Sequence, residues 1–327
     1  MKNNKIGVGF FGAGGVSIVH GEAVKANGKA ELIGIWNRTK SKGIERAKQF
    51  SCKFYKEASD LVNDSEIDMV FILTNVETHL EYTKLAIEKG KHVLVEKPVG
   101  MSINEIKEMK KLAEKAGVVF MPGHNVIYED SIVRIKKMIV SGDIGKIVSF
   151  YYLFNAFHSE ELAAQYPGVV RQMLTHHLYT MLYLAGDPKS VMAMKTCLHY
   201  EKLAREDEAM AILKLEDEGL AHLAVSFAAD DLSSDPWTLL IKVIGTEGSA
   251  RYTWSDWVLA KKGITLSKVF IGYAGGIINE VNHFIDICIN GGKPLSTIDD
   301  AIKAQTIMEA IELSIEKKCC VNLKLNS

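Results

Sequence analysis

Glu96, Lys97 and Pro98 form a charged triplet that directly follows the apolar run His92-Val-Leu-Val. Such a run is typical of a buried parallel strand, and Pro98 ends the strand because proline lacks the N–H that a sheet hydrogen bond needs. An ammonium group at the mouth of a sheet can hold a substrate hydroxyl, stabilise its alkoxide, or relay a proton when burial lowers its pKa. The triplet also fits an ion pair that closes a strand, and position alone leaves both interpretations open.

A glycine-rich turn, residues 12–15, follows the apolar run at 5–11 and precedes a segment of helical periodicity that begins at Val16. A strand, a tight turn and a helix start aim backbone N–H groups and the positive end of a helix dipole at one point, which suits a pyrophosphate. The pattern is G-x-G-x-x-S, with Ser17 at the third small position. Because a second apolar run follows at 31–36, the context predicts a dinucleotide site rather than an ordinary glycine turn.

The segment after this second run reads Asn37-Arg38-Thr39-Lys40. An acidic residue here would accept hydrogen bonds from the ribose hydroxyls and repel a 2′-phosphate. Asn37 does not repel a phosphate, and the three residues after it can donate hydrogen bonds to one. The sequence therefore favours NADP(H), and NAD remains the alternative if Arg38 only stacks on the adenine.

The elements that would position these residues alternate along the first third of the chain. Strands are predicted at 5–11, 31–36, 53–55, 68–74, 92–98 and 118–125, and helices at 41–50, 57–63, 78–89 and 102–115. This alternation predicts a doubly wound parallel sheet of the Rossmann type. Ligands bind such sheets beyond the carboxyl ends of the strands, where Thr74, Asn75, Glu96 and Lys97 are expected.

Two adjacent histidines, His176 and His177, lie within the largely apolar stretch RQMLTHHLYTML at 171–182. At about 100° per helical residue, Gln172, His176 and Tyr179 share one stripe, whereas His177 lies on a more apolar flank. These spacings fit His176 either as a surface histidine or as a site residue. His177 is expected to be a packed histidine with a local hydrogen bond.

Several blocks of the sequence together resemble the Gfo/Idh/MocA oxidoreductases. They are the glycine turn at 12–15, His79 in the segment 74–100, the triplet at 96–98, VSGDIGKIVSFYY at 140–152, IGTEGSARY at 244–252 and the stretch at 280–311. The resemblance extends along nearly the whole chain.

The resemblance implies an α/β fold: an N-terminal Rossmann domain at 1–122, then an α+β substrate and oligomerisation domain at 123–327. The second domain would carry a large, open, mostly antiparallel sheet, and strand pairs are predicted within 208–230 and 237–254, turning at 217–219 and 245–248. A C-terminal helix near 298–316 would pack back between the domains. An open sheet face predicts association of identical chains, as a homodimer or a homotetramer.

In this family a helix bearing an Asp and, four residues later, a His faces the nicotinamide and the substrate. Aligned through the segment LAGD at 184–187, the His position falls on His176, the Asp on Gln172 and a second frequent Asp on Tyr179. An amide can only hydrogen-bond, so proton transfer would rest on His176 and Lys97.

The resemblance implies catalytic roles for Lys97 and His176 and no metal site. Residues expected to bind the substrate are Gln172, Tyr179, Asn125, Tyr128 and Glu96. Residues expected to bind the cofactor are Gly12, Gly14, Gly15, Val16, Asn37, Arg38, Thr39, Thr74, Asn75, His79, Glu96 and Lys97. Loops at 155–171 and 230–236 are expected to shape the substrate pocket.

The function predicted is NAD(P)-dependent hydride transfer to or from a secondary alcohol or ketone carbon of a sugar, a sugar derivative or a cyclic polyol. Two alternatives stay open, an NAD-dependent glycosidase of the same fold and a non-catalytic sensor that binds a dinucleotide. Gln172 in place of an acid supports the sensor, whereas Glu96, Lys97 and His176 argue against it.

Composition excludes several other classes of protein. The formal net charge of -1 leaves no basic face for nucleic acid or for anionic lipid. No segment approaches the roughly 20 unbroken apolar residues of a membrane span, and the glycine-interrupted start fits a strand better than a signal peptide. The five cysteines lack metal-ligand spacing and are expected to be reduced thiols. These features predict a cytoplasmic enzyme with a small-molecule substrate.

Overall fold

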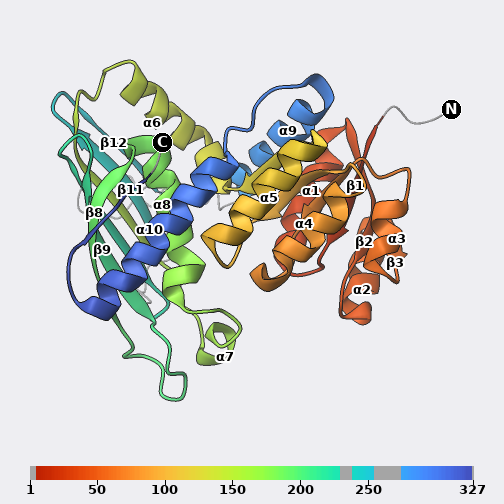
Figure 1. Ribbon diagram of the computed structural model, residues 1–327, viewed down its shortest axis with the longest axis horizontal. Coiled ribbons are helices and arrows are strands. Elements are labelled where there is room, and N and C mark those ends of the chain that lie inside the picture. The colour runs from red at the N-terminus through yellow and green to blue at the C-terminus, as the bar shows by residue number, and fades with distance from the viewer. Residues whose placement is uncertain (1–4, 229–237, 254–273, 326–327) are drawn as a thin grey trace, which may run out of the picture. The chain divides into compact units, whose positions relative to one another are not determined.

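The computed structural model describes residues 5–228, 238–253 and 274–325. They divide into two compact units (Figure 1). The first unit comprises the described residues up to Tyr128 together with Ala274–Ile302, and the second comprises those from Glu129 to 253 and from Lys303 onward. As independently folding domains, the ranges 1–122 and 123–327 stay a prediction.

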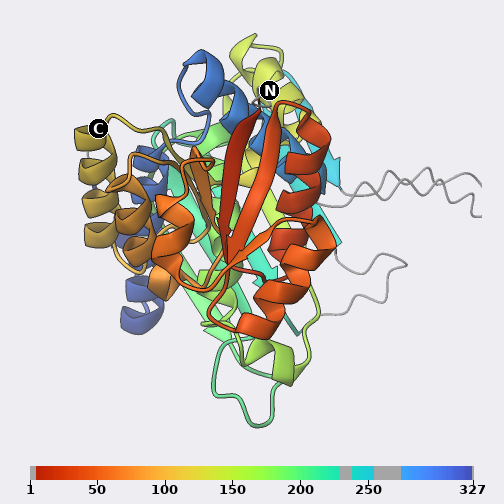
Figure 2. The ribbon, with the colours of Figure 1, turned by 90° about the vertical axis from the view of Figure 1, so that its right-hand side faces the viewer.

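A six-stranded parallel sheet forms the centre of the first unit. Its strands lie in the order β3-β2-β1-β4-β5-β6, which is the Rossmann order. They are β1 (Ile6–Phe11), β2 (Ala30–Trp36), β3 (Lys53–Tyr55), β4 (Met69–Ile72), β5 (His92–Glu96) and β6 (Phe120–Gly123). Helices lie on both sides of the sheet (Figure 2), so all four residues of β4 are buried. The predicted parallel sheet is confirmed.

The helices of the first unit follow the strands as the alternation predicts. They are α1 (Val16–Asn27), α2 (Lys40–Phe50), α3 (Ala58–Asn63), α4 (His79–Ile87) and α5 (Ile103–Ala116), with 3₁₀ turns η1 (Val76–Thr78) and η2 (Asn125–Tyr128). The bounds of α5 follow from its caps, because the Ser102 hydroxyl accepts the Glu105 N–H at 3.3 Å and Gly117 takes a left-handed conformation at the other end.

One helix of the first unit comes from far along the chain. Helix α9 (Ala274–Asn290) packs against α1. Its Phe284 is fully buried against Phe71 of β4, with ring centroids 5.7 Å apart. The core of the first unit is therefore completed by a segment more than two hundred residues away from β4 in sequence.

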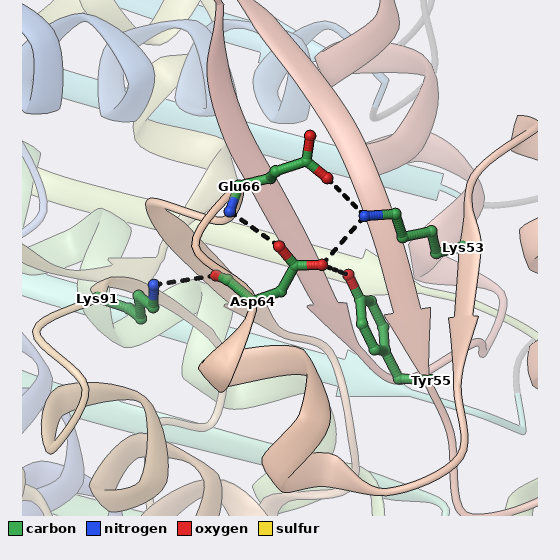
Figure 3. A network of polar contacts seen from close by, with 5 residues as sticks. All are labelled: Lys53, Tyr55, Asp64, Glu66 and Lys91. Carbon is green, nitrogen blue, oxygen red and sulfur yellow. Dashed lines mark hydrogen bonds and ion pairs between the residues drawn. The ribbon is translucent and has the colours of Figure 1, made fainter.

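A polar network holds the loop that leads from α3 into β4 (Figure 3). The Asp64 carboxylate accepts hydrogen bonds from the Tyr55 hydroxyl at 2.6 Å, the Lys53 ammonium at 3.1 Å and the Glu66 N–H at 2.8 Å. Lys91 donates to the Asp64 carbonyl at 3.3 Å. Burial opposes the charge of Asp64, but these donors outweigh it and lower the pKa of the carboxyl. The network therefore stabilises the loop at the amino end of β4. It lies away from the carboxyl ends of the strands, where the ligand is expected.

A seven-stranded sheet forms the second unit, in the order β12-β11-β7-β10-β9-β8-β13. Its strands are β7 (Ile147–Asn155), β8 (Pro188–Thr196), β9 (Glu208–Leu215), β10 (Leu220–Ser226), β11 (Thr238–Gly245), β12 (Ser249–Thr253) and β13 (Val321–Asn322). Among the described strands of this second sheet, only β7 and β10 pair in parallel, so the predicted mostly antiparallel sheet is confirmed. In the turn at 217–219 the left-handed residue is Glu218, with φ of 70°, rather than the glycine after it.

Helices cover one face of this sheet and leave much of the other exposed. The helices are α6 (Asp130–Val140), the single turn α7 (Glu160–Ala163), α8 (Val169–Ala185) and the part of α10 (Ile298–Lys317) that lies beyond Ile302. Helix α8 lies against the sheet (Figure 1), where it contacts β7, β9 and β10. The opposite side, here called the exposed sheet face, presents Tyr151, Met192, Met194, Met210, Ile212 and Leu220. The loop predicted at 230–236 lies outside the described residues.

Candidate active site

The turn between β1 and α1 has the geometry of a phosphate cradle. Gly12 has φ of +109°, and a Cβ at this position would lie 2.6 Å from the Leu73 carbonyl oxygen, so a side chain does not fit. A Cβ on Gly14 or Gly15 would meet no atom within 4 Å, which leaves room for a ligand beside the backbone. Helix α1 then starts with no side-chain cap and no acidic residue in its first turn. Its N–H groups and its dipole suit a pyrophosphate, so these residues fit the predicted dinucleotide.

Asn37 ties this turn to the end of β2. Its Oδ1 accepts the Ala13 N–H at 3.0 Å, and its Nδ2 donates to the Thr39 carbonyl at 2.8 Å. Arg38 and Thr39 beside it are exposed. The amide of Asn37 thus shapes the turn, and a cofactor contact of Asn37, Arg38 or Thr39 stays a prediction.

His79 links the carboxyl ends of β4 and β5. Its ring is buried, with Nδ1 lying 2.9 Å from the Pro98 carbonyl oxygen and Nε2 lying 3.0 Å from the Thr74 carbonyl oxygen. Burial lowers the pKa of His79, although the two carbonyls oppose that shift. A neutral imidazole has one N–H and donates to one of them. His79 therefore holds the backbone around Thr74 and Lys97, Asn75 beside it is exposed, and a direct cofactor contact of His79 stays a prediction.

Glu96 holds the start of the segment that carries Lys97. Its Oε2 accepts the backbone N–H of Lys97 at 3.0 Å, and its Oε1 lies 3.0 Å from Nε2 of His20 in α1. Burial opposes the charge of Glu96, but the hydrogen bond from His20 and the nearby ammonium outweigh it, so the pKa of Glu96 is lowered. Burial lowers the pKa of Lys97, and the charge of Glu96 opposes that shift. The site thus combines an ionised carboxylate with a lysine that releases its proton more readily than usual.

In the second unit, α8 presents the predicted acid–base residue. His176 is partly exposed, and its Nδ1 lies 2.7 Å from the Tyr179 hydroxyl oxygen. The tyrosine hydroxyl can accept from the ring as well as donate to it, and a neutral ring whose Nδ1 donates to the Tyr179 oxygen keeps its lone pair on Nε2, where it can take a proton. Gln172, one turn earlier, is also partly exposed, whereas Tyr179 is buried. The structure thus gives Tyr179 a contact with His176, and a substrate contact of Tyr179 stays a prediction.

His177 belongs to the core of the second unit, as its flank position predicts. It is fully buried, and its ring stacks on that of Tyr152 with centroids 3.8 Å apart. Its Nδ1 lies 3.2 Å from the Met173 carbonyl oxygen and its Nε2 lies 3.1 Å from the Ala224 carbonyl oxygen. Burial lowers the pKa of His177 to about 3. The adjacent histidines therefore differ, one partly exposed and one structural.

The two residues of η2 expected at the substrate are both buried in the first unit. The Tyr128 hydroxyl lies 3.1 Å from Ser296 Oγ, and its backbone carbonyl accepts Asn279 Nδ2 at 3.0 Å. These contacts anchor η2 to neighbouring segments. A substrate contact of Asn125 or Tyr128 stays a prediction.

Residues 6–124 match the family model of an oxidoreductase family with an NAD-binding Rossmann fold, and residues 132–251 match the GFO/IDH/MocA C-terminal domain. The chain belongs to the Gfo/Idh/MocA family. Like its family, this Gfo/Idh/MocA protein is an oxidoreductase whose Rossmann unit binds NAD(P).

Named members of the family are similar over much of their length. A 1,5-anhydro-D-fructose reductase of Ensifer adhaerens is 27% identical over 236 residues, which are 69% of this chain and 69% of the relative. A D-apiose dehydrogenase of Paraburkholderia graminis is 24% identical over 344 aligned positions that cover 99% of this chain and 90% of the relative. The crystal structure of GenD2 from gentamicin A biosynthesis, in complex with NAD, has a TM-score of 0.87 at 21% identity and covers 99% of this chain and 98% of that chain. The last comparison shows a shared fold.

The sequence patterns do not identify three buried ionisable residues that lie near Glu96 in this Gfo/Idh/MocA protein. They are His20 in α1, His124 after β6 and Glu280 in α9. Burial lowers the pKa of His124 to about 3, against an opposing pull from Glu96. Burial also raises the pKa of Glu280 well above its ordinary value, and the charge of Glu96 adds to this shift. His124 follows a strand end, so the rule that selected Lys97 also selects it, whereas no spacing distinguishes His20 or Glu280 within its helix.

Metal binding and membrane insertion each need a distinctive arrangement of residues. Within residues 5–228, 238–253 and 274–325, no three His, Cys, Asp or Glu side chains are grouped so that they could hold a metal ion. Over the same residues, no helix has both the length and the apolar composition to cross a bilayer.

Proposed function

We propose that this protein transfers hydride between a nicotinamide cofactor and a secondary alcohol or ketone carbon of a sugar, a sugar derivative or a cyclic polyol. When bound, the cofactor supplies or accepts the hydride at nicotinamide C4. The proposal depends on one observation, the environment of Lys97 at the carboxyl end of β5. Glu96 accepts the backbone N–H of Lys97, and burial lowers the pKa of the Lys97 ammonium group. The relatives named as reductases and dehydrogenases of small carbohydrates support the substrate class.

In this proposal two side chains handle the oxygen and its proton. Lys97 holds the reacting oxygen and stabilises negative charge on it. His176 takes the hydroxyl proton during oxidation and returns it during reduction, while Tyr179 orients the ring through Nδ1. Gln172 orients a substrate hydroxyl by hydrogen bonding and takes no proton, because an amide does not titrate.

The test of the activity is turnover with either nicotinamide cofactor and a panel of sugars and cyclic polyols, followed by the absorbance of the reduced nicotinamide. Lys97→Ala and His176→Ala are expected to lower kcat/KM by about 100-fold or more while cofactor binding persists. Cofactor binding without turnover of any substrate would contradict the proposal and favour a sensor. Glycoside cleavage without net change in reduced cofactor would favour the glycosidase.

We propose NADP(H) as the preferred cofactor. The support is chemical: the segment directly after β2, residues 37–40, contains no acidic residue, and the exposed Arg38 and Thr39 can donate to a 2′-phosphate. Arg38→Ala is expected to weaken NADPH binding about 10- to 100-fold, since a charge-assisted hydrogen bond contributes about 1.5–3 kcal/mol. NADH binding should change little, and Lys48→Ala, an exposed lysine later in α2, is the matched control. Equal loss for both cofactors would contradict the preference.

We further propose that the exposed sheet face is covered by a second copy of the chain, as a homodimer or within a homotetramer. Met192 pairs with Ile212 and Met194 with Met210 across β8 and β9, so the apolar side chains form a continuous patch. Such patches on a sheet commonly mark interfaces between identical subunits. We also propose that the enzyme acts in the cytoplasm on a small molecule. Its formal net charge is nearly zero, so it offers no basic face to which nucleic acid or an anionic membrane surface could bind.

A further inference from the structure

Two hydrogen bonds connect helix α1 to the segment that carries Lys97. His20 Nε2 lies 3.0 Å from Glu96 Oε1, and Glu96 Oε2 accepts the Lys97 backbone N–H at 3.0 Å. We propose that His20 is a positioning residue that holds the Glu96 carboxylate, and through it the backbone and charge environment of Lys97. The inference rests on the role proposed above for Lys97.

The direction of the first hydrogen bond follows from the chemistry of its partners. The pKa of Glu96 is lowered, so its carboxylate is ionised near neutral pH and only accepts hydrogen bonds. Nε2 of His20 must therefore carry the proton. Nδ1 is buried and has no hydrogen-bond partner among the described residues. The bond to Glu96 is thus the polar contact that the structure gives this ring.

The surroundings of His20 hold its ring in one place. The side chain is fully buried, and its ring meets the edge of Phe71 with centroids 5.7 Å apart at 80°. Phe71 in turn stacks on Phe10 at 5.3 Å and meets Phe284 of α9 at 5.7 Å. Because interiors are close-packed, a ring held this way has few alternative positions. A rigid donor fixes the orientation of the carboxylate that it binds.

The charge balance around Glu96 makes its carboxylate the counter-charge of Lys97. Besides His20, the described groups that interact electrostatically with Glu96 come from different elements. The charge of Lys97 acts to lower the pKa of Glu96, and the charge of Glu96 acts to raise the pKa values of His79 in α4, His124 after β6 and Glu280 in α9. Burial lowers the pKa of both histidines and raises that of Glu280, so these three are uncharged near neutral pH. Among the described groups that shift these pKa values, Glu96 is thus the anion that acts on Lys97, and its charge depends on the donor that His20 supplies.

The experiment measures the ionisation of Lys97 directly. Brief treatment with an amine-acylating reagent at a series of pH values, followed by mass spectrometry of the Lys97 peptide, gives the midpoint of its labelling. In His20→Leu, Glu96 loses a donor and holds its charge less firmly, so the pKa of Lys97 falls. Labelling near neutral pH should rise about tenfold for each pH unit of that shift, and the pH profile of kcat/KM should move in the same direction.

Two variants separate positioning from loss of packing. His20→Gln keeps an N–H donor that can reach Glu96, and its labelling midpoint should stay close to that of the unaltered protein. Glu280→Gln changes a carboxyl that is already uncharged in the same core, so its midpoint should also stay. A wild-type midpoint in His20→Leu, or an equal shift in Glu280→Gln, would overturn the inference.

A second measurement covers the case in which His20→Leu does not fold. Nitrogen-15 NMR of the unaltered protein reports which ring nitrogen of His20 is protonated. We expect a protonated Nε2 whose proton signal moves in Glu96→Gln, and an unprotonated Nε2 would overturn the inference. Labelling and NMR need no turnover, so a failure here is distinct from a failure of the proposed activity.

Discussion

His177 is expected to make the folded protein sensitive to mild acid. Its ring is fully buried against Tyr152 and burial lowers its pKa to about 3, whereas an imidazole in the unfolded chain titrates near 6.5. Between these two values the unfolded state binds a proton that the folded state does not. The stabilising contribution is therefore fully present above about pH 6.5 and is lost progressively as the pH falls toward 3.

The magnitude follows from these two pKa values. Between about pH 7.5 and about pH 5.5, linkage predicts that His177 alone lowers the free energy of unfolding by about 1.4 kcal/mol. Most carboxyl groups contribute little over this interval because they titrate below it. Glu280, whose pKa burial raises, acts in the opposite direction, but it does so equally in the unaltered protein and in both histidine variants. His124, whose pKa burial also lowers to about 3, adds a similar amount.

Urea unfolding at the two pH values tests this for the unaltered protein, His177→Gln and His199→Gln. Glutamine does not titrate, so His177→Gln should reduce the difference between the two pH values by about 1.4 kcal/mol, whatever its own stability. His199 is exposed, and its replacement should leave the difference unchanged. If His177→Gln keeps the full pH dependence, the carbonyls of Met173 and Ala224 outweigh burial and hold the ring protonated, and the reasoning is refuted.

Three further predictions concern the backbone, a helix cap and the exposed sheet face. Gly12→Ala should lower the free energy of unfolding by about 2–4 kcal/mol, because Gly12 has a positive φ and a Cβ there would meet the Leu73 carbonyl. Gly14→Ala should change the free energy of unfolding by no more than about 0.5 kcal/mol but weaken NADPH binding. Equal stabilities of the two variants in thermal melts would contradict this prediction. Ser102→Ala should cost about 1 kcal/mol in urea unfolding, and an unchanged midpoint would show that the hydroxyl does not cap α5. Met210→Lys should dissociate the oligomer in light scattering while the circular dichroism spectrum persists, and an unchanged mass would exclude this face as the interface.

The parallel sheet was predictable because its signal is local. The strands β1, β2, β4 and β5 are short, largely apolar runs bounded by turn residues, and the alternation with helices indicates the architecture. Lys97 was found by the same logic, since it follows a strand end and precedes a proline. His177 was separated from His176 by helical periodicity, and its burial confirms that separation.

The partners of these residues were not predictable, because contacts between distant segments leave no local pattern. His20 and Glu96 are 76 residues apart, and nothing in the helical pattern of α1 distinguishes His20 from a packed histidine. Asn37 was placed at the cofactor from its position after a strand, but its hydrogen bonds to Ala13 and Thr39 could not be read from the sequence. A residue type at a given position indicates which bonds are possible, and packing decides which of them form.

Helix α9 has a consequence for the order of events during translation. Its Phe284 covers Phe71, so the first unit lacks part of its core until residues well beyond the second unit's sheet strands β7 to β12 have left the ribosome. Chains emerge from the amino terminus onward, and a nascent chain that ends at residue 273 would leave the α1 side of β4 open to proteases. Release of the finished chain should close that side. Although it is synthesised first, the nucleotide-binding unit is thus completed only after most of the second unit has been made.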